Sequence, residues 1–307
     1  MLRFILRRLG KGLLTIWFIW SLVFVLVRIS GDPVESMLPD EAQESVREEL
    51  RASLGLDLPI SQQYLKSFTN IFSGDFGKSF YYKRGVAELY GERMLNSYSI
   101  ALPAYALSTV LGILFGVIAA IRHDTALDRT VMTAAIIFYT IPSFAFSIIL
   151  ILIFSLQFHL LPSGNMGSWR NMVLPIVSLT VGPMATVSRL TRSSLLDVLQ
   201  KEYLDGARMK GASEKSVIIK HALRNSLIPV VTTIGLQLGT IIGGAVVVET
   251  VFAWPGIGTL LVTAANQRDF PVVQYGILLI AVMVTLANIL VDVSYGWLDP
   301  RIRESFK

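Results

Sequence analysis

The chain has 307 residues, of which 53% are hydrophobic and only 16% are charged. An ordinary soluble domain carries about 25% charged residues, so this composition indicates that lipid is the main solvent. The absence of cysteine excludes disulfides, thiolate metal sites and cysteine nucleophiles. The net charge of +5 would favour nucleic acid for a soluble protein, but membrane proteins place excess Lys and Arg in inner loops, so we expect no nucleic-acid partner.

Six uncharged runs are long enough to cross a hydrocarbon core, which takes about 20 residues as a helix. They are 12–27, 100–121, 130–158, 171–188, 225–248 and 270–291. A seventh uncharged run, 250–267, contains a Pro-Gly pair that breaks a helix and ends in polar residues. We therefore predict that this seventh run dips into the membrane surface or lies on it.

Positive charge sets the predicted orientation, because Lys and Arg concentrate in cytoplasmic loops. With six spans and a cytoplasmic N-terminus, most basic residues fall on the inner side, including eight between Arg189 and Arg224. The first outer connection has the opposite balance, with eleven acidic and seven basic residues. The basic start is followed by no small-residue cleavage site, so we expect an uncleaved first span. The prediction is an all-α integral membrane protein with both termini in the cytoplasm.

These segments divide the chain into four parts. Residues 1–29 form the N-terminal cytoplasmic segment and the first span, and residues 30–98 form a small folded cap outside the membrane. Residues 99–295 form a five-span core that includes a long cytoplasmic loop at 189–226. Residues 296–307 form a cytoplasmic tail.

No catalytic constellation is visible in the sequence. None of the three histidines begins a metalloprotease helix motif, and no Gly-x-Ser-x-Gly elbow occurs. The segment Gly77-Lys78-Ser79 resembles the end of a phosphate-binding loop, but Phe72 stands where that loop requires glycine. We therefore expect a chain that is not an enzyme, with no metal site and no bound cofactor.

Ionisable residues are nearly lacking inside the predicted spans. Ion-coupled carriers usually need such groups as relays or ligands, so a secondary carrier or channel is the weaker transport hypothesis. A membrane-embedded enzyme is a third hypothesis, with no nucleophile and base to support it. The polar residues Gln237 and Asn288 are expected to form hydrogen bonds between helices.

The loop at 189–226 combines basic residues with apolar residues at helical spacing, and Gly211 interrupts the pattern. This predicts two short amphipathic helices joined at a glycine turn. A basic loop held at the anionic inner leaflet would explain the charge without any partner. It would not explain the small residues at the turn, Gly206, Ala207, Gly211 and Ala212, which suit insertion into a groove on another protein.

The sequence EYLDGARMKGAS at 202–213, followed by HALRN at 221–225, resembles the coupling motif of ABC-importer permeases in the dipeptide, oligopeptide and nickel family. The strict motif has Glu-Ala-Ala, three residues and then Gly. Here Asp205, Gly206 and Ala207 precede Gly211, so either Glu202 or Asp205 supplies the acidic contact. Further segments resemble the family in the same order: GDP at 31–33, GDFGKS at 74–79, ETVFAWPGIG at 249–258, RDFP at 268–271 and DPR at 299–301.

The resemblance covers nearly the whole chain and implies the first of two permease subunits of an importer in a bacterial inner membrane. The implied partners are a second homologous permease, two cytoplasmic ATPases, an external solute-binding protein and the surrounding lipid. ATP and Mg would be bound by the ATPases. The pore would lie between the permeases and pass di- or oligopeptides or related solutes, with nickel, nickel chelates, glutathione, opines and oligosaccharides as alternatives.

The resemblance also implies two sets of contact residues. A short helix near 202–211 would enter a cleft of an ATPase through Glu202, Tyr203, Asp205, Gly206, Ala207, Arg208, Lys210 and Gly211. On the outer side, the cap and the segment 250–269 would dock the binding protein or line the pore mouth. The candidates there are Gly74, Asp75, Phe76, Glu249, Phe252, Trp254, Arg268 and Asp269. The alternative for this outer set is a lid that stabilises the outer ends of the spans.

Overall fold

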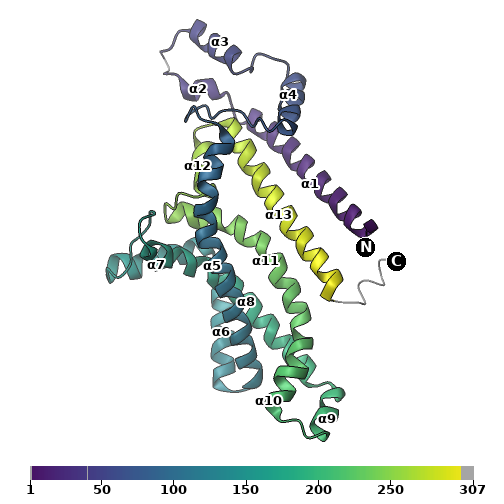
Figure 1. Ribbon diagram of the computed structural model, residues 1–307. Coiled ribbons are helices and arrows are strands. Elements are labelled where there is room, and N and C mark those ends of the chain that lie inside the picture. Colours follow the sequence, from purple (N-terminus) through teal and green to yellow (C-terminus); the bar gives the residue numbers. More distant parts are fainter. Residues whose placement is uncertain (1, 40, 299–307) are drawn as a thin grey trace.

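The computed structural model describes residues 2–39 and 41–298, without the side chains of 2–5, 36, 240, 242 and 292–298. This part of the chain is helical and contains no strand, which confirms the all-α prediction for it (Figure 1). The DPR segment at 299–301 lies outside the described residues. The helices are α1 (Leu2–Ile29), α2 (Pro33–Met37), α3 (Glu44–Ser53), α4 (Ile60–Phe72), α5 (Val86–Ile121), α6 (Ala126–Thr140), α7 (Ser143–Leu150), η1 (Ile151–Gln157), α8 (Trp169–Leu199), α9 (Glu202–Met209), α10 (Glu214–Ser216), η2 (Val217–Ala222), α11 (Leu223–Val251), α12 (Ile257–Asn266) and α13 (Phe270–Leu298).

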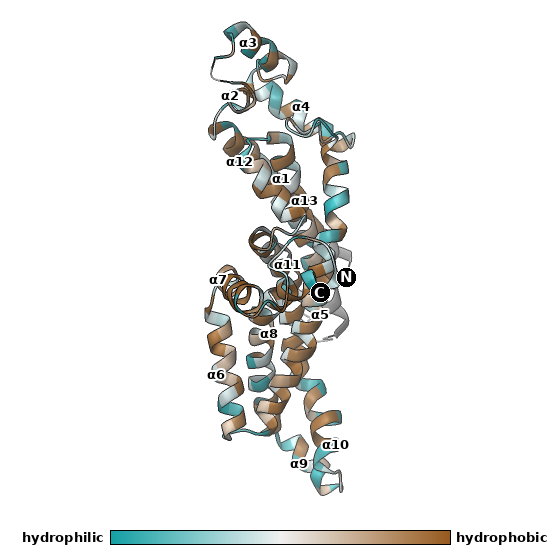
Figure 2. Ribbon diagram, turned by 90° about the vertical axis from the view of Figure 1, so that its left-hand side faces the viewer, coloured by the Kyte–Doolittle hydropathy of each residue, from teal (hydrophilic) through white to brown (hydrophobic). Residues whose placement is uncertain are grey.

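Four of these helices, α1, α5, α8 and α13, are long and apolar enough to cross a membrane. Two bent pairs pass the same test, so the described residues offer up to six spans. Apolar residues dominate these helices, whereas polar residues gather at the two ends of the molecule (Figure 2). An integral membrane protein is confirmed at this level.

The predicted third span, 130–158, is not one straight helix. It divides into α6 and the continuous α7–η1 helix, and the two axes differ by 105°. Ile141 is extended at the break, with φ −73 and ψ 122, and Pro142 precedes the first turn of α7. Because proline disfavours helical conformation at the residue before it, the bend follows from this local sequence.

Two predicted boundaries also shift. Helix α5 begins at Val86, so the boundary at 98 between cap and core lies inside a continuous helix. Helix α8 runs on to Leu199, well past the predicted end of the fourth span. The first of the two expected loop helices, before Gly211, is divided between the extension of α8 and the short helix α9. The second, after Gly211, is α10 and η2, which lead directly into α11.

Three apolar clusters lie one after another along the molecule. We name them, and the two ends of the molecule, by the predicted orientation. The outer cluster, at the cap, joins α1, α5, α12 and α13, and the central cluster joins α5, α7, α8 and α11. The inner cluster joins the ends of α5 and α8 to α9 and η2. Helix α5 contributes to all three, and its Gly112 and Gly116 allow close packing on α8, where an added Cβ would lie 2.7 Å from Val187 Cβ and 2.5 Å from Thr191 Cβ.

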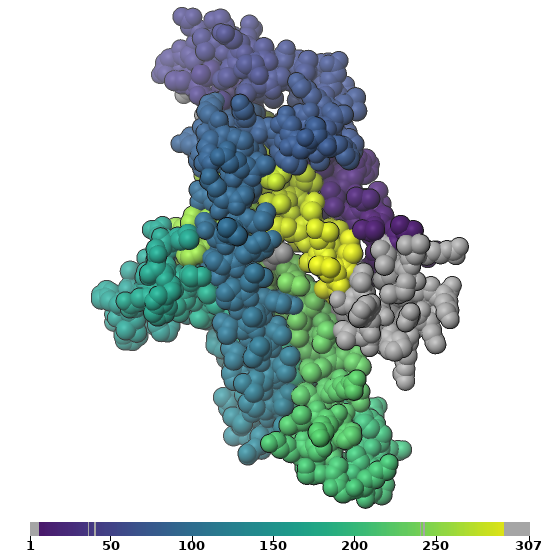
Figure 3. All heavy atoms as spheres, viewed as in Figure 1, coloured from purple at the N-terminus to yellow at the C-terminus, as the bar shows by residue number. Residues whose placement is uncertain are grey.

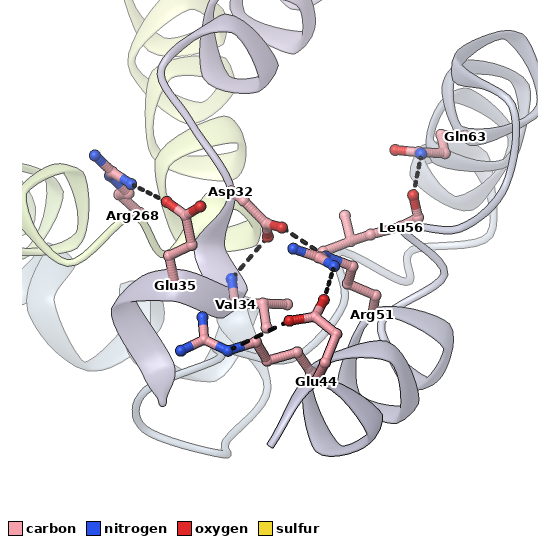
Figure 4. A network of polar contacts seen from close by, with 9 residues as sticks. Asp32, Val34, Glu35, Glu44, Arg51, Leu56, Gln63 and Arg268 are labelled. Carbon is pink, nitrogen blue, oxygen red and sulfur yellow. Dashed lines mark hydrogen bonds and ion pairs between the residues drawn. The ribbon is translucent and has the colours of Figure 1, made fainter. Parts of the chain in front are cut away.

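The cap covers the outer ends of α1 and α13 (Figure 3). Within it, Asp32 accepts a hydrogen bond from the Val34 N–H at 2.9 Å, and Arg51 Nε lies 2.7 Å from the Asp32 carboxylate (Figure 4). Arg51 also pairs with Glu44 at 3.3 Å. These contacts hold α2 and α3 together.

The remaining cap helix, α4, was not predicted. Its Tyr64 hydroxyl lies 2.7 Å from Ser21 Oγ, and its ring packs edge-on against Phe24, at 5.1 Å between centroids. Arg28 Nε donates to Gln63 at 3.0 Å. Helix α4 is therefore held against the outer half of α1.

Candidate functional sites

Helix α9 is a short helix at one end of the molecule (Figure 1), and one of its side chains is fully buried. Leu204 is fully buried against Ala120 of α5, Leu195 of α8 and Val217 of η2. Gly211 ends this segment with φ +82, a left-handed conformation that favours glycine. The predicted helix and glycine turn are therefore present, and α9 is fixed to the ends of two long helices.

Polar contacts tie α9 to α11 and to the turn. The Tyr203 hydroxyl accepts a hydrogen bond from Asn225 Nδ2 at 2.9 Å. Arg208 pairs with Glu214 and Asp205, each at 2.7 Å, and these carboxylates raise the pKa of the Arg208 guanidinium above its ordinary value. Glu202 has no hydrogen bond or ion pair to the described side chains. The sequence did not decide which of the two acids makes the acidic contact with a partner. In the structure Asp205 is paired with Arg208 of the same chain, whereas Glu202 is exposed and has no such partner.

The eight residues predicted to contact an ATPase are all exposed or half-buried, and the structure places them together on α9 and its turn. Sequence reasoning missed Leu204, the residue that holds this surface in place. The sequence signal for this role is that Leu204 stands three residues before Ala207, because residues three apart share one face of a helix. Both side chains pack in the inner cluster.

A buried ion pair joins α6 to α8 near the same end. Asp128 is only 2% exposed and receives Arg192 Nε at 2.6 Å and a second guanidinium N–H at 2.7 Å. The sequence gives no local sign of this pair, which spans 64 positions. Asp128 also lies near His123 and Asp124, a grouping with three potential metal ligands. Its charge is already matched by Arg192, so the arrangement does not favour a cation.

Glu249 holds the start of α12 at the outer end. One carboxylate oxygen accepts hydrogen bonds from the Gly258 N–H at 2.7 Å and the Thr259 N–H at 3.4 Å, and the other accepts from Ser97 Oγ. Ser97 in turn accepts from the Ile257 N–H at 2.8 Å. A carboxylate at a helix N-terminus matches both the unpaired N–H groups and the helix dipole.

The segment before α12 is held by α5 and by the loop after η1. Asn96 donates from Nδ2 to the Pro255 carbonyl at 2.9 Å, and its own carbonyl accepts from Trp254 Nε1, also at 2.9 Å. The Phe252 carbonyl accepts from the Asn165 N–H at 2.8 Å, and a Cβ on Gly164 would lie only 2.2 Å from that oxygen. Residues 252–256 therefore pack between α5 and the loop that contains Gly164 and Asn165.

Asp269 fixes the loop between α4 and α5. Its carboxylate accepts hydrogen bonds from Ser79 Oγ, from the Phe80 N–H at 3.1 Å and from the Tyr81 N–H at 3.3 Å. The next helix, α13, starts at the following residue. Ser79, which in the sequence resembled part of a phosphate loop, is therefore a buried anchor for this connection.

The eight outer candidates do not form one surface. Glu249, Phe252, Trp254 and Asp269 are each 1% exposed and pack inside this chain. Gly74 and Asp75 are exposed, and Phe76 and Arg268 are half-buried. The sequence motifs identified the segments that carry these eight residues. Their burial divides them into four residues packed inside the chain and four that are at least partly accessible.

A central cavity of about 530 Å³ lies between α6, α7, α8 and α11. Its polar lining is uncharged and includes Tyr139, Ser143, Thr186, Thr233 and Gln237. Gln237 Nε2 donates to the Pro183 carbonyl at 3.2 Å, so this residue forms the expected hydrogen bond between helices. Asn288 faces α11, because its Oδ1 would lie 3.8 Å from a Cβ added at Gly239.

Comparison with known proteins covers the whole chain. Residues 1–100 match the family of the N-terminal component of binding-protein-dependent transport system membrane proteins, and residues 112–304 match the binding-protein-dependent transport system inner membrane component. The di/tripeptide transport system permease protein of Pseudomonas aeruginosa (strain UCBPP-PA14) is 39% identical, with 99% of both chains covered. The glutathione transport system permease protein of Escherichia coli (strain K12) is also 39% identical at the same coverage.

A solved structure supports the fold independently. The MetNI methionine ABC transporter, in an inward-facing conformation, contains a chain that superposes with a TM-score of 0.57 at 20% identity. The match covers 69% of this chain and 97% of the other. The curated relatives are named transport permeases, which are not enzymes. The chain therefore belongs to the binding-protein-dependent transport system inner membrane components, as a multi-pass ABC-importer permease of the dipeptide and oligopeptide branch.

Proposed function

We propose that the chain crosses the inner membrane six times, with both termini in the cytoplasm, and forms half of a peptide pore with a second homologous permease. Two cytoplasmic ATPases bind ATP and Mg and drive it, and an external binding protein delivers the cargo. The main observation in support of this proposal is α9, an exposed helix of small and charged residues that Leu204 fixes to the transport core.

Charge supports the proposed orientation. The end of the molecule that bears α9 carries the eight basic residues between Arg189 and Arg224, whereas the cap at the opposite end is net acidic (Figure 1). Lys and Arg favour the cytoplasmic side. In this orientation α9 faces the ATPases and α2 to α4 face the binding protein.

The contacts of α9 provide a route for transmission. Closure of the ATPases around Glu202, Gly206 and the Gly211 turn displaces α9 as a unit. Leu204 passes that displacement to α5 and α8, and the Tyr203–Asn225 hydrogen bond passes it to α11. Helices α8 and α11 border the central cavity, so their movement switches its access between the two sides of the membrane.

The cargo we propose is a di- or oligopeptide. The two relatives carry di/tripeptides and glutathione by name, and the central cavity offers hydroxyl and amide groups without charge. Such groups exchange hydrogen bonds with a peptide backbone and leave its side chains unselected. Nickel chelates and opines are the alternatives within the same importer class.

For the eight outer candidate residues, we propose two different roles. Gly74, Asp75, Phe76 and Arg268 contact the binding protein or the pore mouth, since they are accessible. The four internal residues, Glu249, Phe252, Trp254 and Asp269, shape the pore mouth indirectly by holding the segments that bear it.

The test of α9 replaces Gly206 with leucine. A side chain at Gly206 meets nothing within 4 Å in this chain, so the permease should insert and fold normally. In the proposed complex the leucine fills the space an ATPase cleft requires, so ATP-driven uptake in proteoliposomes should fall at least about tenfold, the loss expected for an overpacked contact.

The matched control is Gly91→Leu, because Gly91 is also helical and has nothing within 4 Å of an added Cβ, but lies in α5 near the cap. It should leave uptake unchanged. Wild-type uptake by Gly206→Leu would show that α9 does not enter a partner.

A further inference from the structure

A second cavity lies between the cap and the ends of α1 and α13. It measures about 620 Å³, which is within the range of small-molecule sites, about 300–1,000 Å³. Its walls come from α1, the turn after α3, α4, the loop at 75–83 and the first turn of α13. None of the residues assigned above to α9 or to the central cavity borders it.

Two hydrogen-bond donors in this cavity have no partner among the described residues. Trp20 and Gln274 both line the cavity, at 6% and 8% exposure. Trp20 Nε1 and Gln274 Nε2 are buried without an acceptor. Leaving a buried donor unsatisfied is costly, so two in one cavity indicate a ligand with oxygen acceptors.

The rim of the cavity is positive. Lys66, Lys78 and Lys83 line it, and no carboxylate of the described chain lies within ion-pair distance of them. The one acid there, Asp75, accepts the Gly77 N–H at 2.9 Å and is turned toward its own loop. Arg28 also lines the cavity and is bonded to neutral oxygens, those of Gln63 and Phe24.

The two donors lie at different depths. Trp20 precedes Ile29, the last residue of α1, by nine positions, which is about 13 Å along a helix. Gln274 is only four residues from the start of α13, where Pro271 and Tyr275 contact the loop that bears Lys78. The ligand must therefore carry negative charge near one neutral acceptor and a second neutral acceptor further along α1.

The surroundings are those of the membrane interface. Helix α4 carries a row of aromatic rings, with Tyr64 stacked on Phe68 and Phe72 edge-on to Phe68, and Phe72 is 78% exposed. Tyr and Trp favour the headgroup level, and Tyr64 and Trp20 both lie here. The adjacent α1 exposes Leu22, Val25 and Leu26 on its side away from the cavity, an apolar surface suited to a lipid environment.

We propose that this cavity binds one anionic glycerophospholipid of the outer leaflet. The lysine rim receives the phosphate, and the ester carbonyls accept hydrogen bonds from Trp20 Nε1 and Gln274 Nε2. An acidic side chain of the binding protein would match the rim but leave the deep donor of Trp20 unsatisfied. The assignment to the outer leaflet rests on the orientation proposed above.

The test is native mass spectrometry of the full chain, purified with its co-purifying subunits and equilibrated with equal amounts of phosphatidylglycerol and phosphatidylcholine. The wild type should retain one phosphatidylglycerol in preference to phosphatidylcholine. Replacing Lys66 and Lys78 together with glutamine should lower that preference about tenfold. Lys11→Gln, at the other end of α1, should leave it unchanged.

The two buried donors predict a different effect. Trp20→Phe should weaken retention of both lipids about fivefold and leave their ratio unchanged, because both carry the same ester carbonyls. Gln274→Met should do the same. Trp17→Phe is the matched control, since Trp17 lies on the same helix, is 48% exposed and does not line the cavity.

Three results would overturn the proposal. The first is lipid retention by the lysine and tryptophan variants equal to that of their controls. The second is displacement of the lipid by trialanine or by inorganic phosphate, which would assign the cavity to cargo or to a free anion. The third is intact lipid retention by the lysine variants together with weakened affinity for the binding protein.

Lipid retention is measured without ATP and without uptake. A chain that retains phosphatidylglycerol but does not transport would contradict the proposed function alone. A chain that transports but shows no lipid preference would contradict this inference alone.

Discussion

At the scale of single residues, three buried carboxylates each join distant segments. Glu249 holds Ser97 and the start of α12, Asp269 holds the loop at Ser79, and Asp128 holds Arg192. Motif resemblance located Glu249 and Asp269 but not their burial. Their partners lie 152 and 190 positions away, so no local pattern reveals them.

Glu249→Gln tests the first of these anchors. In glutamine, an NH₂ group replaces one of the two carboxylate oxygens. This NH₂ group would face either the Gly258 N–H or the Ser97 hydroxyl, so one of these buried donors would lose its acceptor. We expect a loss of about 2 kcal/mol in the free energy of unfolding, measured by thermal unfolding in detergent. Glu88→Gln, an exposed acid on α5, should leave the midpoint unchanged. Equal midpoints for both variants would contradict an anchoring role.

The acid of α9 can be assigned by a paired substitution. Glu202 has no partner among the described side chains, whereas Asp205 is bonded to Arg208 at 2.7 Å. We therefore expect Glu202→Gln to lower ATP-driven uptake more than Asp205→Asn, by about fivefold for one lost charge-assisted contact. In Asp205→Asn, Arg208 keeps its pairing with Glu214. A larger loss in Asp205→Asn would reverse the assignment.

At the scale of elements, apolar runs and breakers predicted most of the helices. The Gly211 turn and α9 followed from local residue types. Helix α4 was missed because its aromatic residues pack on α1, a contact that no sequence window contains. The 105° bend had its signal in Pro142, which was hidden by the uninterrupted hydrophobic run.

The link between α6 and α8 is an element-scale prediction. Asp128→Asn leaves Arg192 without its buried counter-charge, and we expect a loss of about 3 kcal/mol in unfolding free energy. Asp128→Asn combined with Arg192→Gln should cost less than the sum of the single changes, because neither then leaves a lone charge. These losses are measured by thermal unfolding. If the double variant loses as much unfolding free energy as the two single variants together, the pair is not coupled.

At the scale of the whole molecule, the cap and α9 lie at opposite ends, and three apolar clusters connect them (Figure 1). Charge distribution alone predicted which end faces which side, because topology follows Lys and Arg. The path between the ends was not predictable, since it depends on long-range contacts such as those of Leu204 and Tyr90. Tyr90, for example, donates to the Val272 carbonyl at 3.0 Å across 182 positions.

The central claim is that α9 meets an ATPase on the cytoplasmic side. The chain has no cysteine, so a single introduced thiol is unique. Met209 is 83% exposed on α9 and Phe72 is 78% exposed on the cap, which makes them matched positions at opposite ends. Each would be replaced by cysteine and carry a thiol-linked photo-cross-linker in native membranes.

The direct measurement is the mass of the cross-linked product. The account predicts that Met209→Cys forms an adduct with an ATPase subunit and that Phe72→Cys forms none with it. An ATPase adduct at Phe72→Cys, or labelling of Met209→Cys by a membrane-impermeant thiol reagent added outside intact cells, would contradict the account.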